Sequence, residues 1–143
     1  MADSDADGKY DISLNLRSGR VYGVGIDIIE VDRVTRLIEN HSTMLQRIFT
    51  ASERNLISSY AKSSCNLPCR IFAMKEAILK SCAVGWQEGV AWSDMEITGF
   101  ANCHEPILTG KLAEYIISKN IQKVLAVSSA TGSYAVAQAI ALM

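Results

Sequence analysis

Residues 21–29 constrain the fold most, because their side chains alternate between two very different kinds. The alternation predicts a β-strand with large apolar residues on one face, namely Tyr22, Val24, Ile26 and Ile28. Gly23, Gly25 and Asp27 fall on the other face. Two glycines leave that face without side chains, so another backbone or a ligand is able to approach it closely. Asp27 is therefore expected just beyond a bare surface.

Helix signals follow directly after this strand. Asp32 is expected to cap a helix over residues 33–40. Thr50 and Glu53 have the spacing of a capping box, which predicts a second helix reaching about residue 62.

A third helix is predicted over residues 68–83, with Pro68 in its first turn and its end before Gly85. Its apolar positions recur every three or four residues, at Ile71, Met74, Ile78 and Cys82.

The last third of the chain mixes strands with one helix. The elements expected there are a strand over residues 93–100, a loop containing Pro106, a helix over 110–120 capped by Thr109, and two strands over 124–128 and 134–141 joined by a hairpin turn. Strands and helices do not alternate regularly, which favours an α+β fold, an antiparallel sheet packed with helices, over a doubly wound sheet.

Size and charge exclude several classes of protein. At 143 residues the chain fits one domain. Its net charge of -1 does not suit a strongly basic nucleic-acid binder. The chain has no run of about 18 apolar residues, so no membrane-spanning helix is predicted.

Residues 1–20 are predicted to be a polar, partly disordered extension, with a short strand at about 11–16. They are rich in aspartate and resemble neither a secretory signal nor a transit peptide, so a cytoplasmic location is expected. The four cysteines form no zinc pattern.

Three charged residues stand out as candidates for chemistry. Glu76 and Lys80 are four residues apart on one helix face, a spacing that usually makes a surface ion pair. Asp27 is followed by further acidic residues, and a lone strand-end carboxylate usually caps a turn. Asp27 and Glu76 together would nevertheless suit Mg²⁺, which binds proteins through one or two carboxylates and keeps other positions for water and phosphates.

Three motifs, in the right order and separation, resemble those of the holo-[acyl-carrier-protein] synthase family. The first is Gly23-Val24-Gly25-Ile26-Asp27-Ile28-Ile29-Glu30-Val31-Asp32-Arg33-Val34. The second is Arg47-Ile48-Phe49-Thr50-Ala51-Ser52-Glu53, similar to the family's Arg-Ile-Leu-Thr-x-x-Glu, and the third is the Lys-Glu-Ala helix Phe72-Ala73-Met74-Lys75-Glu76-Ala77-Ile78-Leu79-Lys80. The resemblance covers residues 21–143, which are expected to form the phosphopantetheinyl transferase-like domain.

The resemblance implies a reaction and a set of site residues. A carrier-protein serine would attack the β-phosphate of coenzyme A, and 3′,5′-ADP would leave. Asp27 and Glu76 match the family's magnesium ligands, and Lys80 matches a lysine beside the coenzyme phosphates. Glu76 and Lys80 are thus the expected catalytic residues, and either Glu76 or a metal-bound water would accept the proton.

The same resemblance assigns the binding of both substrates. Lys80, Gly85 and Ser129 match positions expected to bind the coenzyme, and Arg33 matches a basic residue that docks the acidic carrier protein. The family implies a homotrimer with active sites between subunits.

Departures from the family pattern lie near the expected coenzyme site. Ala130 replaces a histidine, Val84 occupies the middle of a Gly-Thr-Gly turn, and Glu105 replaces a lysine. A change from lysine to glutamate should weaken the binding of a polyanion, and His104 is a candidate replacement for the lost imidazole. These changes keep open a catalytically diverged relative that binds a carrier protein or coenzyme A, or an enzyme of another coenzyme A-linked reaction.

Overall fold

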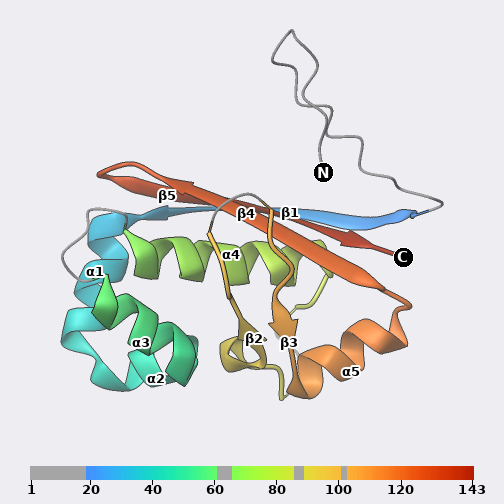
Figure 1. Ribbon diagram of the computed structural model, residues 1–143, viewed down its shortest axis with the longest axis horizontal. Coiled ribbons are helices and arrows are strands. Elements are labelled where there is room, and N and C mark those ends of the chain that lie inside the picture. The colour runs from blue at the N-terminus through green and yellow to red at the C-terminus, as the bar shows by residue number, and fades with distance from the viewer. Residues whose placement is uncertain (1–18, 61–65, 86–88, 101–102) are drawn as a thin grey trace, which may run out of the picture.

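A three-stranded antiparallel sheet forms one layer of the molecule (Figure 1). The computed structural model describes residues 19–60, 66–85, 89–100 and 103–143, so the strand expected at 11–16 lies outside it. The strand order is β1 (Val21–Glu30), β5 (Tyr134–Leu142) and β4 (Lys123–Ala130). The predicted first strand and C-terminal hairpin are therefore confirmed, and β1 pairs with the last strand of the chain.

The helices form a second layer on one side of this sheet (Figure 1). The central one, α4 (Leu67–Ser81), lies along the sheet and packs on β1, β4 and β5. Around it are α1 (Val31–Asn40), α2 (Ser42–Ile48), α3 (Ala51–Ser59) and α5 (Gly110–Ser118). A 3₁₀ turn, η1 (Trp92–Asp94), leads into a small ribbon of β2 (Met95–Glu96) and β3 (Ile107–Leu108). The α+β class expected from the sequence is confirmed.

The bare face of β1 is covered by the backbone of α4. A Cβ atom added to Gly25 would lie 2.0 Å from the carbonyl oxygen of Ala77, and one added to Gly23 would lie 2.3 Å from that of Ser81. The close backbone approach that the two glycines predicted is therefore confirmed. On the neighbouring strand β5, small buried side chains face the same helix, namely Ala135, Ala137, Ala139 and Ala141.

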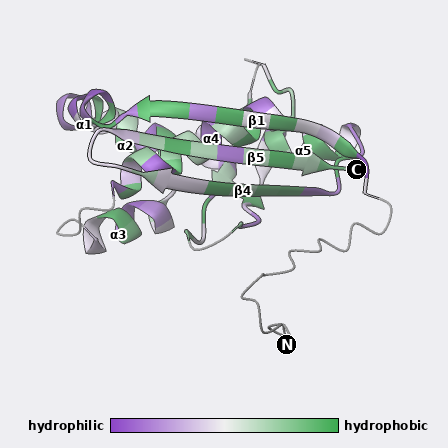
Figure 2. Cartoon of the chain, turned by 90° about the horizontal axis from the view of Figure 1, so that it is seen from above, coloured by the Kyte–Doolittle hydropathy of each residue, from purple (hydrophilic) through white to green (hydrophobic). Residues whose placement is uncertain are grey.

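The opposite face of the sheet is apolar and exposed. Val24, Ile26 and Ile28 of β1 are 52%, 57% and 67% exposed. Val136 of β5 pairs with Ile28 and lies on this face too; Figure 2 views the sheet from above, with β1, β5 and β4 in front of the helices. Within the described part of the chain, no helix or strand covers this surface, which we call the open face.

Several boundaries differ from those that the sequence predicted. The first helix begins at Val31, so Asp32 lies in its first turn and Glu30 takes the cap position, without a side-chain cap hydrogen bond. The sequence did not predict the short helix α2, which has seven residues and a single buried one, Ile48. A helix with so little apolar periodicity leaves a weak signal.

The strand expected over residues 93–100 is mostly not a strand. Asp94 is the physical reason: its carboxylate accepts hydrogen bonds from the backbone N–H groups of Ala91 and Leu112, both at 3.3 Å, and so holds a turn. Only Met95 and Glu96 remain extended in a ladder, and their partner β3 lies where the sequence predicted a loop.

Candidate active site

Two clefts meet at Glu76, on α4. The first has a volume of about 940 Å³ and is lined by the end of β1, by α1 and by α4, including Asp27, Arg33 and Glu76. The second has a volume of about 600 Å³, and its lining includes Lys80 and Gly85. Glu76 lines both clefts, so four of the other predicted site residues line clefts that Glu76 shares.

Asp27 reaches this site because of the glycine two positions before it. Gly25 lets α4 approach β1, and Asp27, on the same face of the strand, then lies beside the C-terminal part of the helix. Its carboxylate accepts a hydrogen bond of 2.6 Å from Nζ of Lys80, which also donates to the carbonyl of Ile26 at 3.1 Å. Lys80 thus pairs with Asp27, whereas the sequence alone suggested a surface pair with Glu76.

The carboxylate of Glu76 has a different partner. Nε1 of Trp92, in η1, donates a hydrogen bond of 2.5 Å to Oε1 of Glu76. The indole also packs edge-on against Phe72, with ring centroids 5.9 Å apart. Trp92 lines the second cleft, and the sequence analysis did not identify it.

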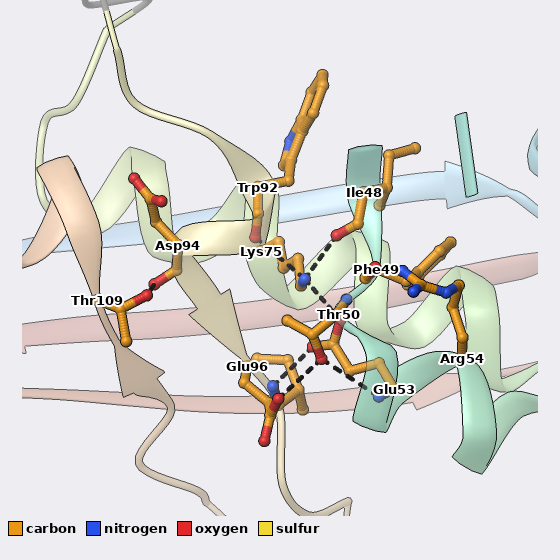
Figure 3. Close-up of polar contacts among 11 residues, drawn as sticks. Ile48, Phe49, Thr50, Glu53, Arg54, Lys75, Trp92, Asp94, Glu96 and Thr109 are labelled. Carbon is orange, nitrogen blue, oxygen red and sulfur yellow. Dashed lines mark hydrogen bonds and ion pairs between the residues drawn. The ribbon is translucent and has the colours of Figure 1, made fainter. Parts of the chain in front are cut away.

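A fully buried ion pair lies behind the site (Figure 3). Nζ of Lys75 donates to Oε2 of Glu53 at 2.7 Å, to the carbonyl of Ile48 at 2.6 Å and to the carbonyl of Trp92 at 3.1 Å. Burial lowers the pKa of the Lys75 ammonium, and the Glu53 carboxylate acts in the opposite direction. Three acceptors around one ammonium satisfy its hydrogen-bonding capacity.

Glu53 joins three segments of the chain. It closes the predicted capping box by accepting from the backbone N–H of Thr50 at 2.8 Å, so that prediction is confirmed. Its second oxygen accepts from the backbone N–H of Ile97 at 2.7 Å. The sequence indicated the helix cap but not the link to Lys75. The available signal was a lysine on the buried face of an apolar helix, where an unpaired charge is unfavourable.

The remaining predicted site residues lie in different places. Arg33 is exposed and lines the first cleft, and Gly85 lines the second. Ser129 is paired with Val136, so its side chain is on the open face, opposite to Asp27. Among the described residues, the lining of the two clefts does not include Ser129.

The residues that depart from the family pattern lie in different parts of the molecule, and one of them lines a cleft. Val84 lines the second cleft, while Glu105 forms an exposed ion pair of 3.6 Å with Lys123. Ala130 packs partly buried against the core. The His104 imidazole packs against Gly99, and its buried Nε2 has no hydrogen-bond partner among the described residues. His104 lines neither cleft. The structure therefore does not support the expectation that His104 replaces the family's histidine, whose position Ala130 occupies.

The donor set fits magnesium better than a transition metal. Asp27 and Glu76 line one cleft, and the described residues contain no group of three or more His, Cys, Asp or Glu side chains able to hold a metal. Two carboxylates suit Mg²⁺, which keeps several waters and takes oxygens from substrate phosphates.

None of the helices in the described part of the chain has both the length and the apolar character that a membrane span requires.

Comparison with known proteins defines the class first. Residues 23–139 match the profile of the 4′-phosphopantetheinyl transferase superfamily. A holo-[acyl-carrier-protein] synthase of Geotalea daltonii is 37% identical over 122 residues, covering 84% of this chain and 97% of the relative. One of Geobacter metallireducens is 34% identical over 122 residues, covering 84% of this chain and 96% of the relative.

Solved structures agree with these sequence matches. An acyl carrier protein synthase of Plasmodium yoelii with ADP bound has a TM-score of 0.72 and 26% identity, covering 87% of this chain and 97% of that one. A Bacillus anthracis holo-(acyl-carrier-protein) synthase in complex with coenzyme A (3′,5′-ADP) has a TM-score of 0.65 and 28% identity, covering 85% of this chain and 96% of that one. The chain belongs to the holo-[acyl-carrier-protein] synthase family, which confirms the resemblance carried by the three motifs.

Proposed function

We propose that this protein transfers 4′-phosphopantetheine from coenzyme A to a serine of an apo acyl carrier protein, giving the holo carrier and 3′,5′-ADP. The observation that carries the proposal is that Glu76 lines both clefts. A transfer between two bound substrates needs the reacting groups at one point, and the boundary between the clefts provides it.

The second cleft suits the coenzyme. Its lining combines Lys80 and Arg47 with apolar side chains such as Leu79 and Val90. A cationic group near one wall favours a polyanionic pyrophosphate, and the apolar surface suits a pantetheine arm. Gly85 lines the same cleft, where a residue without a side chain leaves room for a ligand.

The first cleft suits the carrier protein. Arg33 and Arg36 line it from α1, and both are exposed. Exposed arginines accelerate encounter with an acidic partner and orient it. The carrier serine would therefore approach the pyrophosphate from the side of α1.

Within this arrangement each charged residue has a distinct task. Asp27 and Glu76 would hold Mg²⁺, which when bound neutralises charge on the pyrophosphate. Lys80, beside Asp27, adds positive charge for the leaving 3′,5′-ADP. The serine oxygen forms a bond to the β-phosphorus, the bond to the 3′,5′-ADP oxygen breaks, and the serine proton passes to Glu76 or to water.

Mass spectrometry of an apo carrier protein tests this function. Incubation with the protein, coenzyme A and Mg²⁺ should add about one phosphopantetheine mass to the carrier. Asp27→Ala should reduce the rate by at least about 10²-fold, because one of two metal carboxylates is lost. Asp32→Ala is the matched control, since Asp32 is an exposed aspartate five positions after Asp27 that lines neither cleft, and its replacement should leave the rate unchanged.

The alternative function gives a different result. If several apo carriers gain no mass while calorimetry detects coenzyme A binding, the protein is a diverged binding module. Ala130 and Glu105 motivate this alternative, and the comparison of wild type with Asp27→Ala separates it from the transferase.

We further propose that the protein acts as a homotrimer in the cytoplasm. The open face supports the assembly, because exposed Val24, Ile26 and Ile28 form a contiguous apolar row along β1. A second copy that covers this row and extends across β5 to β4 would also cover Ser129, which lies on the same face. Ser129 would then contribute to a site between subunits rather than to the clefts of its own chain.

A further inference from the structure

We propose that Trp92 is a positioning residue that fixes the carboxylate of Glu76 through its indole N–H. The proposal rests on the proposed function, because it assigns Glu76 to the transferase site and adds the residue that orients it. The two ends of Trp92 carry the argument: its side chain binds Glu76, and its backbone binds the buried ion pair.

The first step is the contact between indole and carboxylate. Nε1 of Trp92 donates to Oε1 of Glu76 at 2.5 Å. A hydrogen bond to an ionised acceptor is stronger than one between neutral groups. Because the indole N–H holds Oε1, it restricts the orientation of the whole carboxylate.

The second step is what holds Trp92 itself. Its carbonyl accepts from Nζ of Lys75, as Figure 3 shows, while the indole points away from the buried cluster. Lys75 is anchored in turn by Glu53. Phe72 packs against the indole ring and further restricts it.

The third step is the relation between Lys75 and Glu76. They are neighbours on α4, and one turns into the core while the other lines the clefts. Both contact the same residue, Trp92, from its two ends. Trp92 therefore connects η1 to α4 through two neighbouring residues, Lys75 and Glu76, so the carboxylate that lines the clefts is oriented by a residue whose backbone is bonded to the buried ion pair.

Loss of such an orienting partner should weaken the metal site. Removing a residue that orients a metal ligand typically lowers metal affinity about 10–100-fold. Trp92→Phe keeps an aromatic ring against Phe72 but removes the N–H. We expect its affinity for Mn²⁺, used as a paramagnetic substitute for Mg²⁺, to fall about tenfold.

Electron paramagnetic resonance of Mn²⁺, with coenzyme A present, provides the binding curves. Tyr115→Phe is the matched control, because it deletes one aromatic donor, the hydroxyl that reaches the carbonyl of Ala83 at 3.3 Å, away from Glu76. The control should bind Mn²⁺ like wild type. At saturating Mg²⁺ the turnover of Trp92→Phe should return to within about twofold of wild type, since the defect is in metal binding.

A second measurement observes the contact directly. The chain has two tryptophans, so in ¹⁵N–¹H spectra the indole resonance that remains in Trp86→Phe is assigned to Trp92. Glu76→Gln should shift that resonance by removing the charge of its acceptor. This reading needs only the native fold of Glu76→Gln, so it decides the question even if Trp92→Phe is unstable.

The outcomes separate the two proposals. Equal Mn²⁺ affinity in wild type and Trp92→Phe, or an unshifted indole resonance in Glu76→Gln, overturns the role of Trp92 and leaves the transferase intact. A wild type that neither binds Mn²⁺ nor modifies any carrier overturns the proposed function, whatever the indole resonance does.

Discussion

Lys75 and Glu53 are two charged residues with fully buried side chains. Taking them out of water is unfavourable, and their mutual attraction and four further hydrogen bonds offset that cost. The pair joins α3, α4 and η1, so it fixes these three elements relative to one another behind Glu76 and Trp92.

Breaking this pair should be strongly destabilising. Lys75→Met removes the ammonium and leaves the Glu53 carboxylate buried without its cation, so the free energy of unfolding should fall by about 3–5 kcal/mol. Urea denaturation followed by circular dichroism measures it. Lys111→Met is the matched control, since Lys111 is in an exposed pair with Glu114 and should change stability by less than about 1 kcal/mol. Equal effects of the two substitutions would contradict a structural role for the buried pair.

At the scale of residues, the sequence identified the charged residues that line the clefts but not the residues that hold them in place. The motifs identified Asp27, Glu76 and Lys80, and the structure places all three at the two clefts. Lys75 and Trp92 were missed, because both act through contacts with segments distant in sequence. No local spacing encodes such contacts.

At the scale of elements, the crossing of β1 and α4 is the most demanding packing in the fold. Gly25 faces backbone atoms of the helix, which cannot rotate away as a side chain can. The alternating glycines made this crossing predictable, because only a bare strand face allows such an approach.

A methyl group at this crossing should therefore be costly. Gly25→Ala should lower the free energy of unfolding by about 3 kcal/mol, at the upper end for overpacking, because its Cβ would meet the carbonyl oxygen of Ala77. Thermal unfolding monitored by circular dichroism measures the loss. Gly132→Ala is the control, because nothing lies within 4 Å of its added Cβ. A Gly25→Ala protein as stable as Gly132→Ala would refute the close crossing.

The elements that sequence reasoning missed are the short ones. The seven-residue helix α2 and the two-residue strand β3 have too few periodic positions for a pattern to appear. The strand expected over 93–100 failed for a different reason, since Asp94 bonds to the backbone of distant Leu112. Tertiary contacts, rather than local preference, decide these segments.

For the molecule as a whole, the two sides of the sheet differ most. One side is packed against helices, and the other carries the open face (Figure 2). Large exposed apolar patches on soluble proteins usually mark interfaces. Only half of this asymmetry was predictable: the glycines of β1 indicated a close approach on one face, but the strand pattern did not indicate that the apolar face would be left without a covering helix or strand.

A charge on the open face should prevent assembly. Ile26→Lys places an ammonium in the middle of the apolar row, so light scattering coupled to gel filtration should give the mass of one chain instead of three. Ile117→Lys is the matched control, since Ile117 is also exposed, at 73%, but lies on α5. A monomeric wild type, or an Ile26→Lys protein that remains trimeric, would argue against this interface.

The position of Glu76 on the boundary between the clefts also affects how the protein is able to diverge. Under the proposed function, residues that line only one cleft, such as Arg36 or Val90, touch one substrate each. Selection is then free to adapt them to a new carrier or a modified coenzyme separately. Glu76 has no such freedom, because any replacement alters the handling of both substrates at once. Lineages that change specificity should therefore accumulate substitutions on the outer walls of the clefts and retain the wall between them.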